Sequence, residues 1–149
     1  MARLFLLALI LVPALAQGVR TGITPGEMEA RLKAGSYRYE RVEEGGRVYF
    51  HLRLAGLRAV LFLQDCREGS CESLLLYAGF STDNPPSLER VNEWNREKRF
   101  SRAYLDEEGD PVLEADLDLA GGVADGAIRA FLDLFEENLR AFAAWIGWE

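Results

Sequence analysis

The chain has few of the residue types that most often carry catalysis or bind metals: one histidine, His51, and two cysteines, Cys66 and Cys71, in 149 residues. A single histidine excludes catalytic triads that need a second one, and it excludes most zinc sites. In a strand, His51 lies on the face opposite Phe50 and Leu52, so we expect it at the surface.

The two cysteines flank a four-residue turn, which predicts a hairpin with both at its tip. There they can lie opposite each other, within the Cα separation that a disulfide tolerates. We therefore expect a structural Cys66–Cys71 disulfide. The alternatives are a redox pair, which usually has C-x-x-C spacing at a helix N-terminus, and half of a metal site, for which no second thiol pair is present.

Basic residues concentrate between Arg90 and Arg102. Such a group can bind an anion or an acidic peptide, and the candidate residues are Arg96, Lys98, Arg99 and Arg102. The alternative, which we favour, is that the basic side chains pair with acids on the same helix and on a neighbouring strand. These acids are Glu89, Glu93, Glu97, Glu114, Asp116 and Asp118.

No acidic or glycine-rich stretch forms a recognisable catalytic site. The carboxylates from Glu114 to Asp118 repeat at about 6.8 Å along a strand, too far apart to share one cation. The turn from Asp106 to Asp110 lacks the calcium-loop pattern, and Gly121-Gly122 lacks the lysine and the spacing of a phosphate loop. We expect a protein that is not an enzyme and needs no cofactor or metal.

Hydrophobic periodicity predicts the elements that position these groups. Residues 100–105 and 112–119 alternate as two strands around a tight turn. If Leu105 lies opposite Pro111, the small and apolar side chains share one face and Arg102 lies opposite Glu114. Burial and charge then specify the same register.

The remaining pattern completes an α+β fold with an antiparallel sheet of about six strands. A capping box from Thr24 to Glu27 begins the first helix, Ser87 caps a helix between strands four and five, and a long helix ends at Ile146. We expect helices on one sheet face and an open face that carries Arg102, Glu114, Asp116 and Asp118. The predicted elements are 24–34, 37–43, 48–53, 59–63, 74–80, 87–98, 100–105, 112–119 and 124–146.

Two groups of helix residues have more than one interpretation. Asn92 and Asn95, on either side of Trp94, can hydrogen-bond loop backbone or bind a ligand. The predicted structural motif consists of Asn92, Trp94, Asn95, Gly121 and Gly122. The last helix carries a second apolar line that covers the sheet edge or binds a partner, and tryptophan is a typical interface anchor. This C-terminal line consists of Leu134, Ala141, Trp145 and Trp148.

The first residues have the pattern of a secretory signal peptide: Arg3, an apolar run from Leu4 to Val12, and an A-x-A site that ends at Ala16. The run is too short to span a membrane comfortably. We therefore expect residues 1–16 to be removed and residues 17–149 to form one exported domain, periplasmic or extracellular, with no integral membrane segment. The whole chain has a net charge of −7, which argues against nucleic-acid binding.

One stretch resembles a known family. The run from Asn92 to Val123, N-E-W-N-R-E-K-R-F-S-R-A-Y-L-D-E-E-G-D-P-V-L-E-A-D-L-D-L-A-G-G-V, resembles the signature region of the YbjN-like family of bacterial sensory transduction regulators. The resemblance extends over roughly Thr24 to Trp145. It implies a fold similar to type III secretion chaperones, dimerisation, and no established catalytic residues. Many members lack a signal peptide, so the one predicted here argues against a cytoplasmic role.

These observations favour an exported, non-catalytic protein that binds another protein, as a chaperone-like or regulatory module of the cell envelope. A homodimer is a further expectation. The alternative function is a sensor that binds a small ligand in a pocket lined by polar groups near Asn92 and Asn95.

Overall fold

A computed structural model describes residues 18–148, and the predicted signal peptide, residues 1–16, lies outside this range. Within the described range the chain forms three helices, a six-stranded antiparallel sheet and a small two-stranded sheet, which confirms the predicted α+β class. In chain order the elements are β1 (Val19–Arg20), α1 (Pro25–Ala34), β2 (Arg38–Glu44), β3 (Arg47–Leu54), β4 (Leu57–Arg67), β5 (Ser70–Gly79), α2 (Leu88–Glu97), β6 (Arg102–Leu105), β7 (Pro111–Asp118), β8 (Val123–Ala124) and α3 (Asp125–Ile146).

The large sheet has the strand order β2-β3-β4-β5-β7-β6, so the last hairpin joins the sheet through β7 and leaves β6 at the edge. Leu105 lies opposite Pro111, and Arg102 lies opposite Glu114, as the alternation predicted. This register turns Ala103 and Leu113 into the core, where both are buried.

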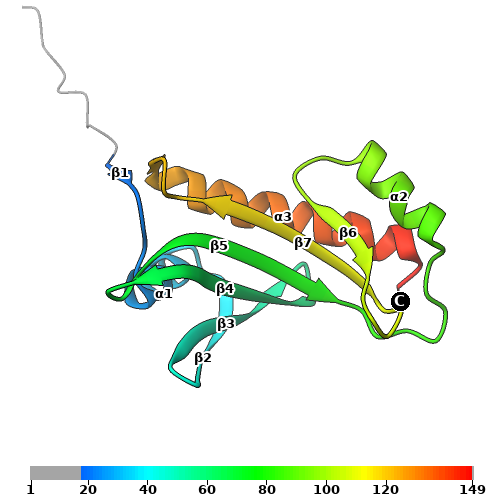
Figure 1. The fold of residues 1–149 in the computed structure, drawn as a ribbon, viewed down its shortest axis with the longest axis horizontal. Helices are drawn as coiled ribbons and strands as arrows, with labels where there is room; N and C mark the ends of the chain where they lie inside the picture. Colours follow the sequence, from blue (N-terminus) through cyan, green and yellow to red (C-terminus); the bar gives the residue numbers. More distant parts are fainter. Residues whose placement is uncertain (1–17, 149) are drawn as a thin grey trace, which may run out of the picture.

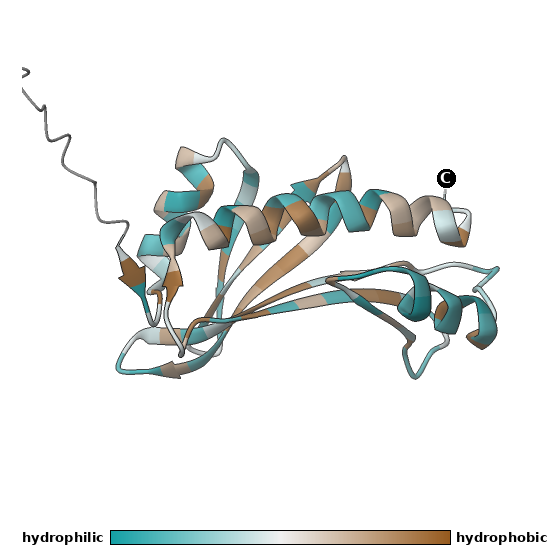
Figure 2. Cartoon of the chain, turned by 90° about the horizontal axis from the view of Figure 1, so that it is seen from above, coloured by the Kyte–Doolittle hydropathy of each residue, from teal (hydrophilic) through white to brown (hydrophobic). Residues whose placement is uncertain are grey.

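Helix α3 lies along one face of the sheet, and α1 packs at the end of the sheet near the start of α3 (Figures 1 and 2). Two carboxylates of α3 accept hydrogen bonds from residues just before β2 and in the turn between β3 and β4. Asp133 accepts a hydrogen bond from the Tyr37 hydroxyl, and Glu136 accepts one from the backbone N–H of Ala55. The helix contributes a buried stripe at the expected spacing: Ile128, Leu132, Phe135, Leu139 and Phe142.

Helix α2 packs beside the edge strand β6 and closes one end of the core. Trp94 is fully buried, and its ring meets Phe142 of α3 edge-on with 5.0 Å between centroids. The Ser87 hydroxyl accepts the Arg90 N–H, so the predicted cap is present.

The start of α1 also follows the predicted local chemistry. The Thr24 hydroxyl accepts the Glu27 N–H (3.2 Å), and the Glu27 carboxylate accepts the Thr24 N–H (2.8 Å), which completes a capping box. The helix ends at Ala34, but the left-handed residue beyond it is Ser36 (φ 59°), and Gly35 stays right-handed.

Sequence reasoning missed the small sheet, in which Val19 of β1 lies opposite Ala124 of β8. Strands of two residues are too short to show any periodicity. The predicted strand start at Phe100 was also wrong. Phe100 has a positive φ of 66° and is 61 % exposed, because the chain reverses direction there and β6 begins only at Arg102.

The hairpins have the expected turn chemistry. Gly45 and Gly46 connect β2 to β3 with positive φ at both positions, as a two-residue type I′ turn requires. At the tip of β4 and β5, Cys66 and Cys71 lie opposite each other and form the predicted disulfide. Cys71 also exchanges two backbone hydrogen bonds of 2.9 Å with Ile23, which joins the tip to the segment before α1.

Candidate binding surface

The outer face of the large sheet, defined as the face away from α1 and α3, presents side chains in ordered rows. Directly paired residues on neighbouring strands point to the same side of a sheet, so the pairing defines each row. The central row crosses all six strands and consists of Glu40, His51, Val60, Tyr77, Glu114 and Arg102. Beside it lies the aromatic row: Val42, Tyr49, Phe62, Leu75 and Asp116.

The aromatic row is apolar over four strands and only half-buried. The rings of Tyr49 and Phe62 lie 5.6 Å apart, and His51 meets Tyr49 edge-on at 5.5 Å. His51 is exposed, as predicted. A contiguous apolar patch with polar neighbours, left accessible on a folded domain, is typical of a surface that contacts another molecule.

Glu114 is buried, with 6 % of its surface exposed, and this corrects the expectation that it lies open to water. Arg102 donates from Nε to the Glu114 carboxylate (2.9 Å), and the Tyr104 hydroxyl donates to it as well (2.8 Å). Burial and the hydrogen bond to Glu114 raise the pKa of Tyr104 to about 12. The side chains of the edge strand thus cover this carboxylate, whereas Asp116 and Asp118 are exposed, as predicted.

A third row on the outer face, the arginine row, consists of Arg38, Arg53 and Arg58. Sequence analysis did not identify it. The signal was present in the two-residue turns, because Gly45-Gly46 places Arg38 opposite Arg53 and Ala55-Gly56 places Arg53 opposite Arg58.

The arginine row lines a hollow of about 780 Å³, and the aspartates of the β6–β7 turn contribute to the same hollow. Asp106 accepts the N–H groups of Glu108 and Asp110, and Asp110 accepts the N–H of Thr82. Tyr77 also lines the hollow. Its pKa is raised, mainly by burial and next by the negative charge of Asp106.

The predicted basic group lies around the C-terminal end of α2, and the structure does not gather it into one pocket. Arg96 Nη2 lies 3.5 Å from Glu97 Oε1, and the guanidinium carbon of Arg99 lies 4.7 Å from the Phe100 ring centroid. Lys98 lies 5.5 Å from the centroid of the Trp145 ring. Arg102 belongs to the Glu114 contact. Anion binding by this group therefore stays a prediction.

The tryptophans of the C-terminal line contact the rest of the domain. The Arg90 guanidinium lies 3.5 Å from the Trp145 ring centroid, and Trp145 Nε1 donates to the Arg90 carbonyl (3.1 Å). Trp148 meets Phe80 edge-on at 5.2 Å and stays 37 % exposed. Leu134 is half-buried and Ala141 is exposed. A partner-binding role of this line stays a prediction.

The two asparagines have different roles. Asn95 donates to the Ala103 carbonyl (2.9 Å) and accepts the Ala103 N–H (2.8 Å), so its amide holds the edge strand β6 against α2. Asn92 is exposed, and Trp94 donates to the Ser101 hydroxyl. The use of Asn95 by the backbone weakens the case for a ligand pocket at this position.

The two glycines of the Gly-Gly corner also differ. Gly122 has a φ of +87°, and a Cβ placed there would come within 2.8 Å of Val19 Cγ1. A Cβ on Gly121 would meet no atom within 4 Å. Of these two positions, only 122 therefore requires glycine, both because of its backbone conformation and because of its close approach to β1.

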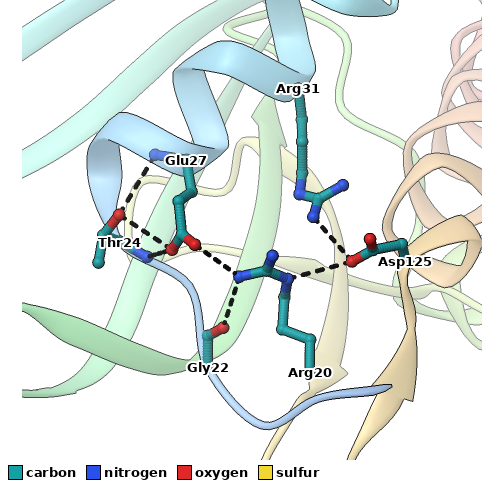
Figure 3. Close-up of polar contacts among 6 residues, drawn as sticks. All are labelled: Arg20, Gly22, Thr24, Glu27, Arg31 and Asp125. Carbon is teal, nitrogen blue, oxygen red and sulfur yellow. Dashed lines mark hydrogen bonds and ion pairs between the residues drawn. The ribbon is translucent and has the colours of Figure 1, made fainter. Parts of the chain in front are cut away.

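A polar cluster ties β1, α1 and the start of α3 together (Figure 3). Arg20 donates to Glu27 (3.0 Å) and to Asp125 (3.2 Å), and Arg31 donates to Asp125 (2.7 Å). Two guanidinium groups meet two carboxylates, so the charges balance within the cluster. We interpret it as a structural clasp.

Within residues 18–148, no group of three His, Cys, Asp or Glu side chains is placed to hold a metal ion. The helices of the described chain include none that is long and apolar enough to cross a membrane.

The geometry defines a small α+β protein with one sheet face covered by helices and a charged, partly aromatic outer face. Residues 24–148 match the YbjN family, described as "Putative bacterial sensory transduction regulator", and the chain belongs to this family. This confirms the resemblance found in the sequence, and the family description names a regulator. No curated protein matches the chain.

Proposed function

We propose that this protein is an exported, non-catalytic module of the cell envelope that binds another protein in a chaperone-like or regulatory role. The observation that carries the proposal is the aromatic row, in which Tyr49, Phe62 and Leu75 are half-buried on a sheet face that α1 and α3 leave uncovered. Burial of such side chains contributes about 25 cal/mol for each Å² of apolar surface removed from water, so a protein partner would stabilise them.

The family match supports a binding role as well. The description of the YbjN family names a regulator of sensory transduction, and a regulator acts through a partner.

Partner capture tests the proposal. The protein purified after expression of the full chain is immobilised and exposed to a cell-envelope extract, and retained proteins are quantified by mass spectrometry. A Phe62→Gln variant removes an aromatic side chain from the outer face, and an Ala141→Glu variant places a charge on the C-terminal line. Ala141 is exposed, so we expect this second change to leave the packing of Trp145 in place.

We expect a specific protein that wild type and Ala141→Glu retain and Phe62→Gln loses. The opposite pattern would move the interface to the C-terminal line. Equal retention by all three proteins would show that neither the aromatic row nor the C-terminal line is the interface. If no specific protein is retained, the result argues against the proposal. Light scattering of the purified protein tests the expected homodimer, in which the partner is a second copy of the chain.

Export is tested separately by N-terminal sequencing of the protein recovered from cells that express the full chain. We expect the mature protein to begin at Gln17, because the A-x-A pattern ends at Ala16. An unprocessed protein in the cytoplasm would contradict the envelope location and leave the binding function to the capture experiment.

A further inference from the structure

The arginine row places three like charges next to one another on adjacent strands. Arg38 lies opposite Arg53, and Arg53 lies opposite Arg58, with all three exposed. Paired positions on neighbouring strands bring Cβ atoms within about 5 Å, and like charges directly opposite each other destabilise a sheet. An external anion between the guanidinium groups would relieve this repulsion.

Internal contacts do not neutralise the row. Among residues 18–148, neither Arg38 nor Arg58 forms a salt bridge or a side-chain hydrogen bond, and Arg53 donates only to the Gly56 carbonyl (3.2 Å). By contrast, Arg41, on the other side of β2, forms an ion pair with Glu29 (2.9 Å). The guanidinium groups of the row are therefore available to an external anion.

The surroundings of the row define what kind of anion fits. Val60 and Tyr77 of the central row form an apolar part of the same hollow, whose volume is about 780 Å³. Three acids, Glu40, Asp106 and Asp110, line it as well, and they repel negative charge. A ligand would thus direct its anionic groups to the arginine row and lay apolar side chains on Val60 and Tyr77.

We propose that the arginine row and its hollow bind an acidic segment of the partner protein, with carboxylates paired to Arg38, Arg53 and Arg58. This inference rests on the proposed protein-binding function and specifies the chemistry of the partner. Arginine matches carboxylates through paired hydrogen bonds.

The extent of the surface favours a protein segment over a single small anion. The row spans three strands, or about 10 Å at the usual strand spacing. The aromatic row continues the surface on the same face through Tyr49 and Phe62. Tyrosine, phenylalanine and arginine are the residue types enriched where proteins contact one another.

Fluorescence anisotropy with defined peptides tests the proposal. The probe is a labelled heptapeptide of alternating glutamate and tyrosine, and the control probe has glutamine in place of glutamate. We expect the protein to bind the glutamate probe about ten-fold or more tightly than the glutamine probe, because hydrogen bonds to charged groups are the stronger ones. Binding should weaken as NaCl rises from about 50 to about 500 mM, since salt screens exposed charges.

Two charge-matched variants locate the site. One combines Arg38→Gln, Arg53→Gln and Arg58→Gln, and the other combines Arg96→Gln, Lys98→Gln and Arg99→Gln near the end of α2. The second variant removes most of the other candidate anion site, so the pair decides between the two. We expect the first to lose about ten-fold or more in affinity for the glutamate probe and the second to bind like wild type. Thermal unfolding confirms that both variants are folded.

Equal losses in both variants would show a general charge effect and overturn the assignment. So would a folded wild-type protein that binds inorganic phosphate but not the peptide. A homodimer that the arginine-row variant abolishes, without probe binding, would assign the row to a second copy of the chain instead. In the capture experiment, a partner retained equally by wild type and the arginine-row variant overturns this inference but leaves the proposed function standing.

Discussion

Asn95 shows how one side chain fixes the position of an element. Its amide satisfies both backbone groups of Ala103 at the edge strand, where no further strand is available to do so on that side. Buried polar groups that lose their partners cost free energy, so this amide supports the whole β6 edge, including the Arg102 contact with Glu114.

We predict that Asn95→Ala lowers the free energy of unfolding by about 1 to 3 kcal/mol, because it leaves the Ala103 N–H and carbonyl without these partners. Urea unfolding measures the change. Asn92→Ala is the matched control and should stay within about 0.5 kcal/mol, since Asn92, unlike Asn95, makes no side-chain hydrogen bond within residues 18–148. Equal effects of the two substitutions would contradict a special role of Asn95.

Gly122 offers a second test at the residue scale. Gly122→Ala should destabilise the protein by about 1 to 3 kcal/mol, because alanine disfavours a φ of +87° and its Cβ would clash with Val19. Thermal unfolding should show a lower Tm. Gly121→Ala meets no neighbouring atom and should leave the Tm nearly unchanged. A tolerated Gly122→Ala would mean that β1 does not pack against the corner as described.

At the scale of elements, short contacts join pieces that are far apart in the sequence. The clasp around Asp125 connects β1 and α1 to the first turn of α3 (Figure 3). A carboxylate in the first turn also interacts favourably with the helix dipole. Glu27 serves both the cap of α1 and the clasp, so its charge state should affect the anchoring of all three elements.

The Thr24 N–H, together with Arg20, lowers the pKa of Glu27 from 4.5 to about 2. A carboxyl whose pKa is lower in the folded state stabilises the fold above its unfolded pKa, and this contribution is lost as pH falls through the folded pKa. We predict that stability decreases between about pH 4.5 and pH 2, and that Glu27→Gln makes this decrease shallower.

Urea unfolding over a pH series measures the effect, and glutamine retains the capping geometry while removing the charge. Glu137→Gln, at an exposed position on α3, should keep the wild-type slope. A Glu27→Gln variant with the wild-type pH dependence would show that the clasp does not contribute to acid stability.

At the scale of the whole molecule, the outer face has an uneven charge distribution. The arginine row lies on β2, β3 and β4, with Glu40 beside it on β2, whereas the exposed acids Asp116 and Asp118 lie on β7. The net charge of −7 conceals this division. Because exposed charges act over about 8 Å at physiological ionic strength, an acidic partner would respond to the local row and not to the net charge.

We predict that the combined Arg38→Gln, Arg53→Gln and Arg58→Gln variant unfolds at the same temperature as wild type or a higher one. The wild-type sheet contains two like-charged cross-strand pairs, Arg38 with Arg53 and Arg53 with Arg58, and such pairs destabilise a sheet. Calorimetry at low and high salt measures this, and added salt should stabilise wild type more than the variant. A loss of more than about 1 kcal/mol would show that the arginines support the fold through their aliphatic stems.

The sequence alone determined the features that depend on neighbouring residues. Periodicity and caps predicted all three helices and the six strands of the large sheet, and the alternation around Pro111 predicted the register of β6 and β7. The cysteine spacing predicted the disulfide. These succeed because backbone geometry and side-chain alternation are local properties.

Only the tertiary structure decided what each side chain meets across the sheet and between elements. It buried Glu114 beneath Arg102 and Tyr104, and it brought Arg38, Arg53 and Arg58 together from three strands. It also placed Trp145 against Arg90, 55 positions away. Such contacts depend on strand order and helix packing, which no short stretch of sequence specifies, and they define the surface to which we assign the function.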